Sequence, residues 1–437
     1  MSTNIFGIHD ENTITQFKEI EKNCVAAALM ADGHYGYVMP VGGVAAYYDK
    51  VSVIGVGFDI ACGNCAIKTD IKLSNLVGFN LQDSINNPSR IINNTTLNKL
   101  ADDIARNISF GIGRANEADD APTDNKLFDD DSWWIIPNIG KYRDDLKDKA
   151  RRQLGTVGSG NHYVDIFADE DDNIWVGVHF GSRGLGHTIA SNFLAIGQGG
   201  TWGDKGKEIE TLLNIYSSTG LEYWSLMSLA GEYAYAGREW VCRKVINILG
   251  GKELEMVHNH HNFAWKEQHI VNDDLETLIV VRKGATPAFP KQKGFIGGSM
   301  GDNAVIIEGT GISLDDEEGW WNATEDDRLL SGIQQTALYS TVHGAGRIMS
   351  RNHAAGKWDR KKKKYKTRGV ISENMRDGWL NKQGVILRGG GLDEAPQVYR
   401  RLPDVLNAQK NTINILHTLK PLIVVMAKAN EYDPYKD

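Results

Sequence analysis

Short clusters of glycine end the apolar runs of this chain, and this pattern constrains the fold more than any other. The sequence holds 47 glycines but only 10 prolines. Apolar runs bounded by such clusters are typical of short buried strands, and they occupy residues 51–56, 174–178 and 278–281. Helical periodicity is clearer over residues 211–236, 326–340 and 396–406. Because strands and helices alternate without a regular β-α-β repeat, we expect an α+β fold and not a doubly wound sheet.

Composition narrows the class of protein. The formal net charge is -8, so any contact with a nucleic acid must come from a local basic patch. Four scattered cysteines do not form a disulfide framework and suit a reducing compartment. Since neither a signal peptide nor an apolar stretch of about 18 residues is visible, we expect a cytoplasmic protein with no membrane partner. Without repeats or linkers, residues 1–437 are expected to form a single domain.

Two segments depart from this average. Residues 116–131 carry seven acidic side chains and are expected to form a solvated surface loop. Residues 360–368, RKKKKYKTR, are strongly basic and hold one aromatic residue. Such a run is either a solvated hairpin or loop or a contact with an RNA backbone, and the sequence favours neither.

The segment GFDIACGNC at residues 57–65 places a carboxylate and two thiols on one tight turn. Cys62 and Cys65 form a C-x-x-C pair of the kind found in zinc and redox sites. A structural zinc site needs a second ligand pair, and none follows. Asp59 and Cys62 together offer a hard oxygen and a soft thiolate. The structural alternative is a buried turn with two small apolar cysteines.

Two further turns end in imidazoles or amides. Residues 154–162, LGTVGSGNH, form a glycine-rich run that ends in Asn161 and His162, and small residues allow a backbone to approach a ligand closely. The run lacks the lysine of a Walker A loop, so a turn with a hydrogen-bonded histidine is the alternative. His179 follows an apolar run, and Arg183 lies on the next glycine turn. This pair suits a metal and a phosphate, respectively.

Histidines also gather in the second half of the chain. Residues 258–262, HNHHN, place three histidines within four positions, which favours metal binding over a purely structural role. His343 precedes a glycine turn whose amides can hold phosphate oxygens. Arg347 and Arg351 are spaced to share one helical face, and a core histidine at a helix start is the alternative. Taken together, these separate turns indicate a metal centre that performs phosphoryl chemistry.

The order of these motifs resembles that of the RtcB family of RNA ligases over nearly the whole chain. The resembling segments are MADGHYG at 30–36, GFDIACGN at 57–64, GTVGSGNHYVDI at 155–166, HFGSRG at 179–184, HHN at 260–262, RKGATPA at 282–288, GGSMG at 297–301, HGAGRIMSR at 343–351 and DEAPQVY at 393–399. The resemblance implies a single RtcB-like domain of mixed, largely antiparallel sheets, flanked by helices around a central metal cleft.

The resemblance also implies two manganese ions. Cys62, His162 and His179 would hold one ion. Asp59, Cys62 and His261 would hold the other, with Cys62 as the bridge. Ligand softness alone favours zinc as much as manganese, so the choice of metal comes from the family.

By the same resemblance, His343 would attack the α-phosphate of GTP and form a histidine–GMP intermediate. The nucleotide would pass to an RNA 3′-phosphate, which a 5′-hydroxyl end then attacks, in tRNA splicing or RNA repair. A 2′,3′-cyclic phosphate end would first be opened. Arg183 and Arg347 would neutralise phosphates. The residues expected to contact the nucleotide are Asn161, His162, Asp165, His261, Asn262, Gly298, Ser299, Met300, Gly344, Ala345, Gly346 and Tyr399.

Three positions near the expected base site depart from the family pattern. Asp165 replaces a glutamate, Ala304 replaces a serine, and Met426 stands where the family has a lysine, with Lys428 two residues further on. We therefore hypothesise that the phosphate chemistry is retained while the selectivity for guanine is relaxed.

Two other functions compete with the ligase. The first is a metal-dependent RNA-end phosphodiesterase that opens cyclic phosphates without joining ends. The second is a non-catalytic factor associated with RNA, against which His343 and the full ligand set argue. The sequence does not identify an activating protein partner.

Overall fold

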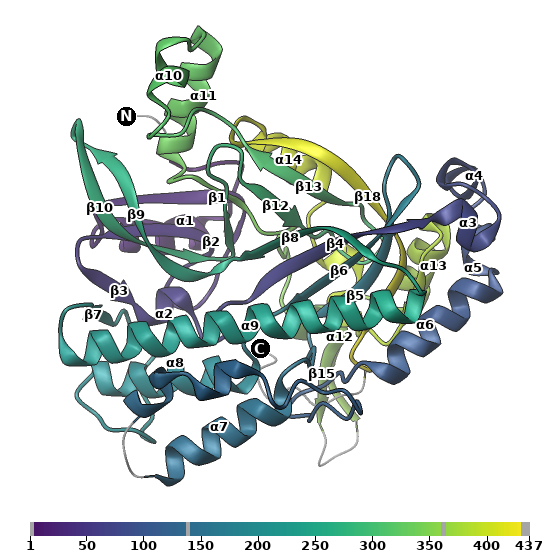
Figure 1. Cartoon of the computed structure of the whole chain (residues 1–437), viewed down its shortest axis with the longest axis horizontal. Helices are drawn as coiled ribbons and strands as arrows, with labels where there is room; N and C mark the ends of the chain where they lie inside the picture. Colours follow the sequence, from purple (N-terminus) through teal and green to yellow (C-terminus); the bar gives the residue numbers. More distant parts are fainter. Residues whose placement is uncertain (1–3, 137–139, 360–363, 430–437) are drawn as a thin grey trace.

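The computed structural model describes residues 4–136, 140–359 and 364–429, and its largest element is a curved sheet at the centre of the molecule (Figure 1). Its strands lie in the order β12 (Lys293–Ile296), β13 (Ala304–Gly309), β18 (Ile413–Met426), β5 (Tyr163–Ala168), β6 (Asn173–Phe180), β4 (Gly63–Lys72) and β8 (Glu253–His260), and β17 (Ile386–Arg388) also pairs with β18. The β17–β18 pair is parallel, and the other pairs in this sheet are antiparallel.

A second, four-stranded antiparallel sheet has the order β1 (Ala26–His34), β2 (Val41–Tyr47), β10 (Asp274–Lys283) and β9 (Asn262–Val271). The smaller pairs are β11 (Ala285–Pro287) with β14 (Ser340–Val342), β3 (Lys50–Ser52) with β7 (Leu212–Asn214), and β15 (Gly356–Asp359) with β16 (Lys364–Arg368). The expected α+β class with largely antiparallel sheets is confirmed.

Burial on both faces explains why some strands are continuously apolar. In β10, Leu278 and Val280 face one hydrophobic cluster, whereas Ile279 and Val281 face another. Successive side chains of a strand point to opposite faces, so the stretch that is covered on both sides has no solvent-exposed position and is apolar throughout. The expected strands at 174–178 and 278–281 are therefore confirmed as parts of β6 and β10.

The helix α9 (Ser218–Leu249) is 32 residues long and runs across one face of the large sheet, over β4 and β6 (Figure 1). The other α-helices are α1 (Glu11–Glu21), α2 (Val53–Val56), α3 (Leu73–Val77), α4 (Leu81–Asn86), α5 (Ser89–Ile92), α6 (Thr95–Asn107), α7 (Lys141–Gln153), α8 (Arg183–Gly197), α10 (Glu317–Trp321), α11 (Glu325–Thr336), α12 (Arg351–Ala355), α13 (Glu373–Gln383) and α14 (Leu402–Gln409). The 3-10 helices are η1 (Lys126–Asp129), η2 (Asp131–Ile135), η3 (Leu392–Glu394), η4 (Pro396–Val398) and η5 (Lys410–Thr412).

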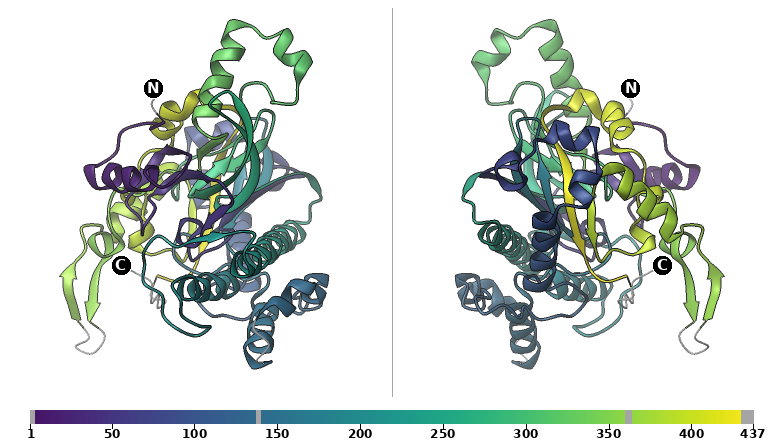
Figure 2. Two further views of the ribbon diagram at one scale, coloured as in Figure 1. Left: turned by 90° about the vertical axis from the view of Figure 1, so that its left-hand side faces the viewer. Right: turned by 90° about the vertical axis from the view of Figure 1, so that its right-hand side faces the viewer.

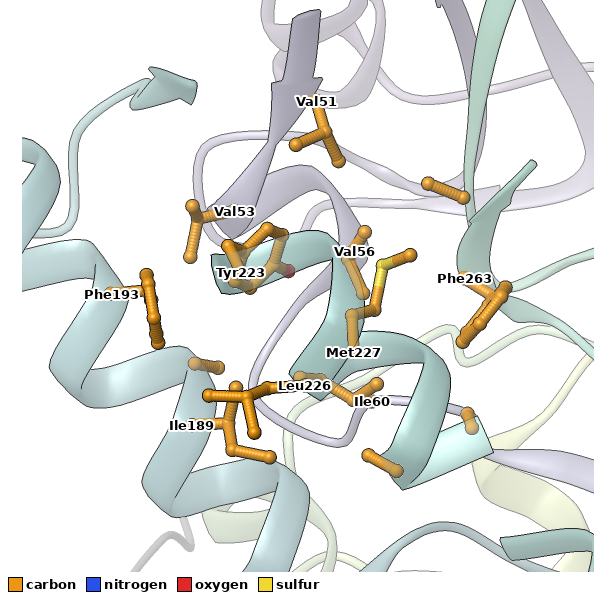
Figure 3. Close-up of a cluster of buried hydrophobic side chains, with 14 of the residues drawn as sticks. Val51, Val53, Val56, Ile60, Ile189, Phe193, Tyr223, Leu226, Met227 and Phe263 are labelled. Carbon is orange, nitrogen blue, oxygen red and sulfur yellow. The ribbon is translucent and has the colours of Figure 1, made fainter. Parts of the chain in front are cut away.

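The N-terminal half of α9 closes one hydrophobic core. Its side chains Tyr223, Leu226 and Met227 are fully buried and face Val56 of α2 and Ile189 of α8 (Figure 3). Because this core anchors α2, it also supports the turn that follows α2, which carries Asp59 and Cys62.

Several expected boundaries are wrong for local reasons. The helix expected at 211–236 begins only at Ser218, because β7 precedes it and Ser217 caps its first turn, and it continues to Leu249. The helix expected at 326–340 is α11, which ends at Thr336 before two residues of positive φ lead into β14. The helix expected at 396–406 is divided into η4 and α14.

The strand expected at residues 51–56 is also divided. Ser52 ends β3, and its hydroxyl accepts a hydrogen bond from the amide of Gly55 at 2.9 Å, which starts the short helix α2. A side-chain cap of this kind is a local hydrogen bond that an apolar pattern does not reveal.

The two charged segments differ in structure. Residues 116–131 are largely exposed, as expected, although η1 lies within them and buries Phe128. In the basic segment, residues 360–363 lie outside the described residues, and β15 and β16 form a hairpin that projects from the body (Figure 2). All four cysteines are free. Among the described residues, no helix has the length and hydropathy needed to span a membrane.

Candidate active site

Four neighbouring strands bring the candidate metal ligands to one edge of the large sheet. His162 directly precedes β5, His179 lies near the end of β6, Cys62 precedes β4, and His261 follows β8. The strands lie in the order β5-β6-β4-β8, and each is antiparallel to its neighbour. The start of one strand therefore lies beside the end of the next, so all four ligands lie at the same end of these strands. Residues separated by up to 199 positions therefore meet in space.

Asp59 completes the group from the turn before β4. A Cβ atom at Gly181 would lie 2.2 Å from Oδ1 of Asp59, so only glycine leaves room for the carboxylate. The side-chain amide of Asn262 donates a hydrogen bond to the backbone oxygen of Asp59 at 3.3 Å and supports the turn.

The ligand atoms form two triads that share one sulfur. Cys62, His179 and His261 offer atoms within 4.8 Å of one another, and so do Asp59, Cys62 and His162. Nε2 of His179 lies 3.2 Å from Sγ of Cys62, and Nε2 of His162 lies 3.7 Å from it. Each triad can hold one ion, and Cys62 can bridge the two.

This grouping differs from the one that the resemblance implied. There, His162 belonged with His179, and His261 belonged with Asp59. In the structure, Nε2 of His162 lies 3.2 Å from Oδ2 of Asp59, whereas the ring of His261 packs at 5.0 Å against that of His179. Compared with the implied grouping, His162 and His261 therefore exchange places between the two ligand sets.

The chemical state of these groups fits a divalent cation. Burial, assisted by neighbouring histidines, lowers the pKa of His179 and of His261 well below the usual value, so both rings are neutral and can ligate. Burial would raise the pKa of Asp59, but His162 and Arg183 outweigh it and lower that pKa to about 2. Burial and Asp59 raise the pKa of the Cys62 thiol, so a bound cation would have to displace its proton.

His343 is held beside the triads by a buried carboxylate. Its ring lies 4.9 Å from the ring of His261, centre to centre. Nδ1 of His343 lies 2.6 Å from Oδ2 of Asp32, a fully buried residue of β1. The same oxygen accepts hydrogen bonds from the backbone amides of His343 and Gly344, at 3.0 and 3.2 Å. This contact leaves Nε2 of His343 as the nitrogen available for chemistry.

A cavity of about 300 Å³ joins His343 to the candidate ligands. Of the residues expected at the site, it is lined by Asp59, Cys62, Asn161, Asp165, His179, His261, Asn262, Gly298, Ser299, Met300, His343, Gly344, Ala345, Gly346, Arg347 and Tyr399. His162, Arg183 and Ala304 do not line it. Met426 does line it, whereas Ala304 is fully buried in β13.

The two arginines expected to neutralise phosphates lie in different surroundings. Arg183 lies behind His162, with 3.4 Å between its Nη1 and Nδ1 of His162, and a Cβ atom at Gly158 would clash with its guanidinium. Arg347 lines the cavity but is bound to Glu394 at 3.1 Å and to the hydroxyl of Tyr399 at 3.0 Å.

The expectation that Arg347 and Arg351 share a helical face is wrong. Arg347 lies in an irregular turn that forms a bridge with Tyr399, and α12 begins only at Arg351. The two arginines nevertheless converge, because Arg351 lies 3.1 Å from the other oxygen of Glu394.

Three residues in or beside the cavity were not singled out from the sequence. His34 and Lys283 line the cavity, whereas Asp32 does not line it but lies against His343. Asp32 and His34 belong to the MADGHYG segment, and Lys283 belongs to RKGATPA, but neither segment was given a chemical role. The Nζ atom of Lys283 is buried without a hydrogen-bond partner among the described residues. Their positions within segments that resemble family motifs could have indicated that they belong to the site.

These features together define a class: an α+β protein whose buried aspartate, cysteine and histidines form a candidate metal centre beside a histidine-lined cavity. Residues 13–427 match the family model described as tRNA-splicing ligase RtcB. The chain therefore belongs to the RtcB family.

Relatives agree with this assignment over most of their length. The chain is 27% identical to the tRNA-splicing ligase RtcB of Thermococcus kodakarensis, over 90% of this chain and 86% of the relative. It is 27% identical to the RNA-splicing ligase RtcB of Escherichia coli, over 91% and 89%. It is 29% identical to the tRNA-splicing ligase RtcB of Methanococcus maripaludis, over 86% and 82%.

Proposed function

We propose that this protein is an RNA ligase whose residues 1–437 form one ligase domain. It joins RNA ends that carry a 3′-phosphate or a 2′,3′-cyclic phosphate to 5′-hydroxyl ends, in tRNA splicing or RNA repair. One observation carries the proposal: the ring of His343 lies 4.9 Å from that of His261, in the cavity that both triads border. Membership of the RtcB family supports the same function.

We further propose two manganese ions as cofactors. Cys62, His179 and His261 would hold one, and Asp59, Cys62 and His162 would hold the other. Bound there, the cations would neutralise charge that develops on phosphoryl oxygens.

The first chemical step falls to His343. With Nδ1 held by Asp32, its Nε2 lone pair attacks the α-phosphorus of GTP, a P–N bond forms, and pyrophosphate leaves. The Gly344–Gly346 backbone and Ser299 line the space available to the nucleotide. Lys283, with its buried ammonium group, is placed to balance phosphate charge.

The second stage moves the nucleotide to RNA. An oxygen of the RNA 3′-phosphate attacks the phosphorus on His343, the P–N bond breaks, and the ring is released. The 5′-hydroxyl of the second RNA then attacks the activated 3′-phosphate, and GMP leaves. Arg347 and Arg351 would face the RNA phosphates, provided that the substrate displaces part of their binding to Glu394.

We also propose that guanine selectivity is relaxed. Asp165 and Met426 line the cavity in place of the longer carboxylate and the lysine, and Val424 beside them is apolar. Burial raises the pKa of Asp165 well above the usual range, which favours the protonated carboxyl, a group with both a donor and an acceptor. Labelling of His343 by radiolabelled GTP and by radiolabelled ATP decides the matter, and a strong signal from GTP alone would refute it.

An end-joining assay tests the ligase proposal. RNA with a 3′-phosphate is incubated with 5′-hydroxyl RNA, with and without manganese and GTP. A joined product that needs both additions is expected from the wild-type protein, and none is expected from His343→Ala. Opening of cyclic phosphates without joining, even with GTP, would identify the phosphodiesterase instead. Equal joining by His343→Ala would contradict the proposed nucleophile.

A further inference from the structure

Arg238 is a fully buried arginine in the middle of α9. Among the described residues, no carboxylate lies within ion-pair distance of its guanidinium. A buried cation without a counter-ion is costly for a fold, and an apolar side chain of similar volume would usually be tolerated better. Fold stability therefore does not explain why this position holds an arginine.

The guanidinium donates hydrogen bonds to four neutral acceptors. Nη1 donates to the backbone oxygens of Ala61 at 2.9 Å and of Phe180 at 2.7 Å. Nε donates to Nε2 of His258 at 2.8 Å, and Nη2 donates to Nδ1 of His260 at 2.9 Å. Because arginine has no acceptor, each histidine nitrogen must present its lone pair, and this fixes the tautomer of each ring.

Three of these acceptors are chain neighbours of candidate metal ligands. Ala61 directly precedes Cys62, and His260 directly precedes His261. Phe180 directly follows His179. The residues come from the turn before β4, the end of β8 and the end of β6, so one planar group connects three separate segments.

The other histidines of the HNHHN segment belong to this arrangement and not to the metal triads. His258 and His260 are two positions apart on β8 and point toward α9, where the ring of Tyr235 stacks on His260 at 3.9 Å. Nδ1 of His258 lies 3.7 Å from Glu239, on the helix beside Arg238. Both rings are thus held from a second side, which limits movement of the guanidinium.

From this geometry we infer that Arg238 is the positioning residue of the metal centre, because it sets the relative placement of Cys62, His179 and His261. The inference rests on the metal centre of the proposed function and not on RNA joining. A rigid planar fork is needed, since a lysine in the same place could not reach all four acceptors.

Metal binding in purified protein tests this inference without any ligation. Cobalt(II) is titrated into metal-free protein while the thiolate-to-cobalt absorption band is recorded, and manganese affinity is obtained by competition. The variants are Arg238→Lys, which keeps the charge, and Arg238→Met. The matched control is Val245→Ala, which leaves a cavity at a buried position of the same helix, two turns away from Arg238. Thermal unfolding of each metal-free protein measures its stability.

We expect Arg238→Lys to fold, to bind cobalt about 10- to 100-fold more weakly and to show an altered thiolate band, as for other residues that orient metal ligands. Val245→Ala should lose thermal stability but keep its cobalt affinity within about twofold. Unchanged affinity and band in Arg238→Lys would overturn the inference, and so would an equal loss of affinity in Val245→Ala. If the wild-type protein bound no cobalt through its thiolate, both this inference and the proposed metal centre would fail. If it bound cobalt but joined no RNA, only the ligase proposal would fail.

Discussion

Oδ2 of Asp32 lies 2.6 Å from Nδ1 of His343, and the same oxygen accepts the backbone amides of His343 and Gly344. Asp32 lies on β1 and His343 follows β14, so 311 positions of sequence separate the two residues. A single buried carboxylate oxygen thus orients both the imidazole and the start of the glycine turn. The proposed nucleophile is held through Nδ1, which leaves Nε2 as the reacting nitrogen.

Replacing Asp32 with asparagine should slow the formation of the His343–nucleotide bond by about 10²- to 10⁴-fold, because the amide no longer holds the correct tautomer of the ring. The initial rate of covalent labelling by radiolabelled GTP measures this effect. Asp169→Asn is the matched control, since Asp169 is equally buried but bonds to Asn173 and Trp175, outside the cavity. Slow labelling in both variants would point to a general loss of structure.

The shared sulfur predicts a particular pattern of metal loss. Cys62→Ala should lose both ions, because Cys62 belongs to both triads. The double variant Asp59→Ala/His162→Ala should retain one ion, because both residues belong to the same triad. Elemental analysis after gel filtration in manganese gives the stoichiometry. Loss of both ions from the double variant would instead support the grouping of His162 with His179.

Lys283 should set the alkaline limit of nucleotide transfer. Burial lowers the pKa of its ammonium group to about 8, although Glu210 and Glu208 oppose that shift. Its positive charge is therefore present below pH 8 and lost above it, and kcat/KM for labelling of the free enzyme should fall as pH rises through that value. Lys283→Met should lower kcat/KM by about 100-fold at pH 7, and Lys283→Arg should remove the alkaline fall.

The matched control for that experiment is Lys420→Met. Lys420 is a half-buried lysine of β18 that does not line the cavity and donates to the backbone oxygen of Gln383. Its loss should leave the pH profile unchanged. An alkaline fall that persists in Lys283→Arg would assign the titration to another group.

A buried ion pair should make the free energy of unfolding depend on pH in the acid range. Arg282 is fully buried and lies 2.5 Å from Glu267. Burial would raise the pKa of Glu267, but Arg282 and His269 outweigh it and lower that pKa below its usual 4.5. The pair's contribution is therefore complete above pH 4.5 and is lost as pH falls through the lowered value.

Glu267→Gln should accordingly destabilise the protein by about 3–5 kcal/mol at neutral pH, because Arg282 stays buried without its partner. This difference should shrink as the pH falls through the lowered pKa of Glu267, since the wild-type carboxyl then also becomes neutral. Urea unfolding of metal-free protein at neutral pH and at successively lower pH values provides the measurement. A difference that is constant with pH would contradict the assigned pair.

Residue patterns predicted those parts of the fold that depend on burial alone. The runs at 174–178 and 278–281 are strands because both faces are covered. The run at 51–56 is also mostly apolar, yet the hydroxyl of Ser52 caps a short helix that replaces the second half of the expected strand. Segment ends of this kind depend on single hydrogen bonds, which periodicity does not contain.

The types of ligand in the candidate site could be predicted, but their grouping could not. Which histidine lies beside Asp59 depends on the order of strands β5, β6, β4 and β8, and that order is a property of the folded sheet. In the HNHHN segment, by contrast, the period of two in a strand already separates His261 from the pair at 258 and 260. Reading that segment as the end of a strand would have indicated two structural histidines.

The position of β18 has a consequence for how the protein is made. This strand lies between β13 and β5, although every other strand of the sheet is translated before it. The centre of the sheet therefore stays open until residue 426 has emerged from the ribosome, and β5 must wait exposed for a neighbour that is synthesised much later. A nascent chain can carry all the candidate metal ligands and His343 and still lack Val424 and Met426, which line the cavity. Assembly of the cavity is thus coupled to the synthesis of β18.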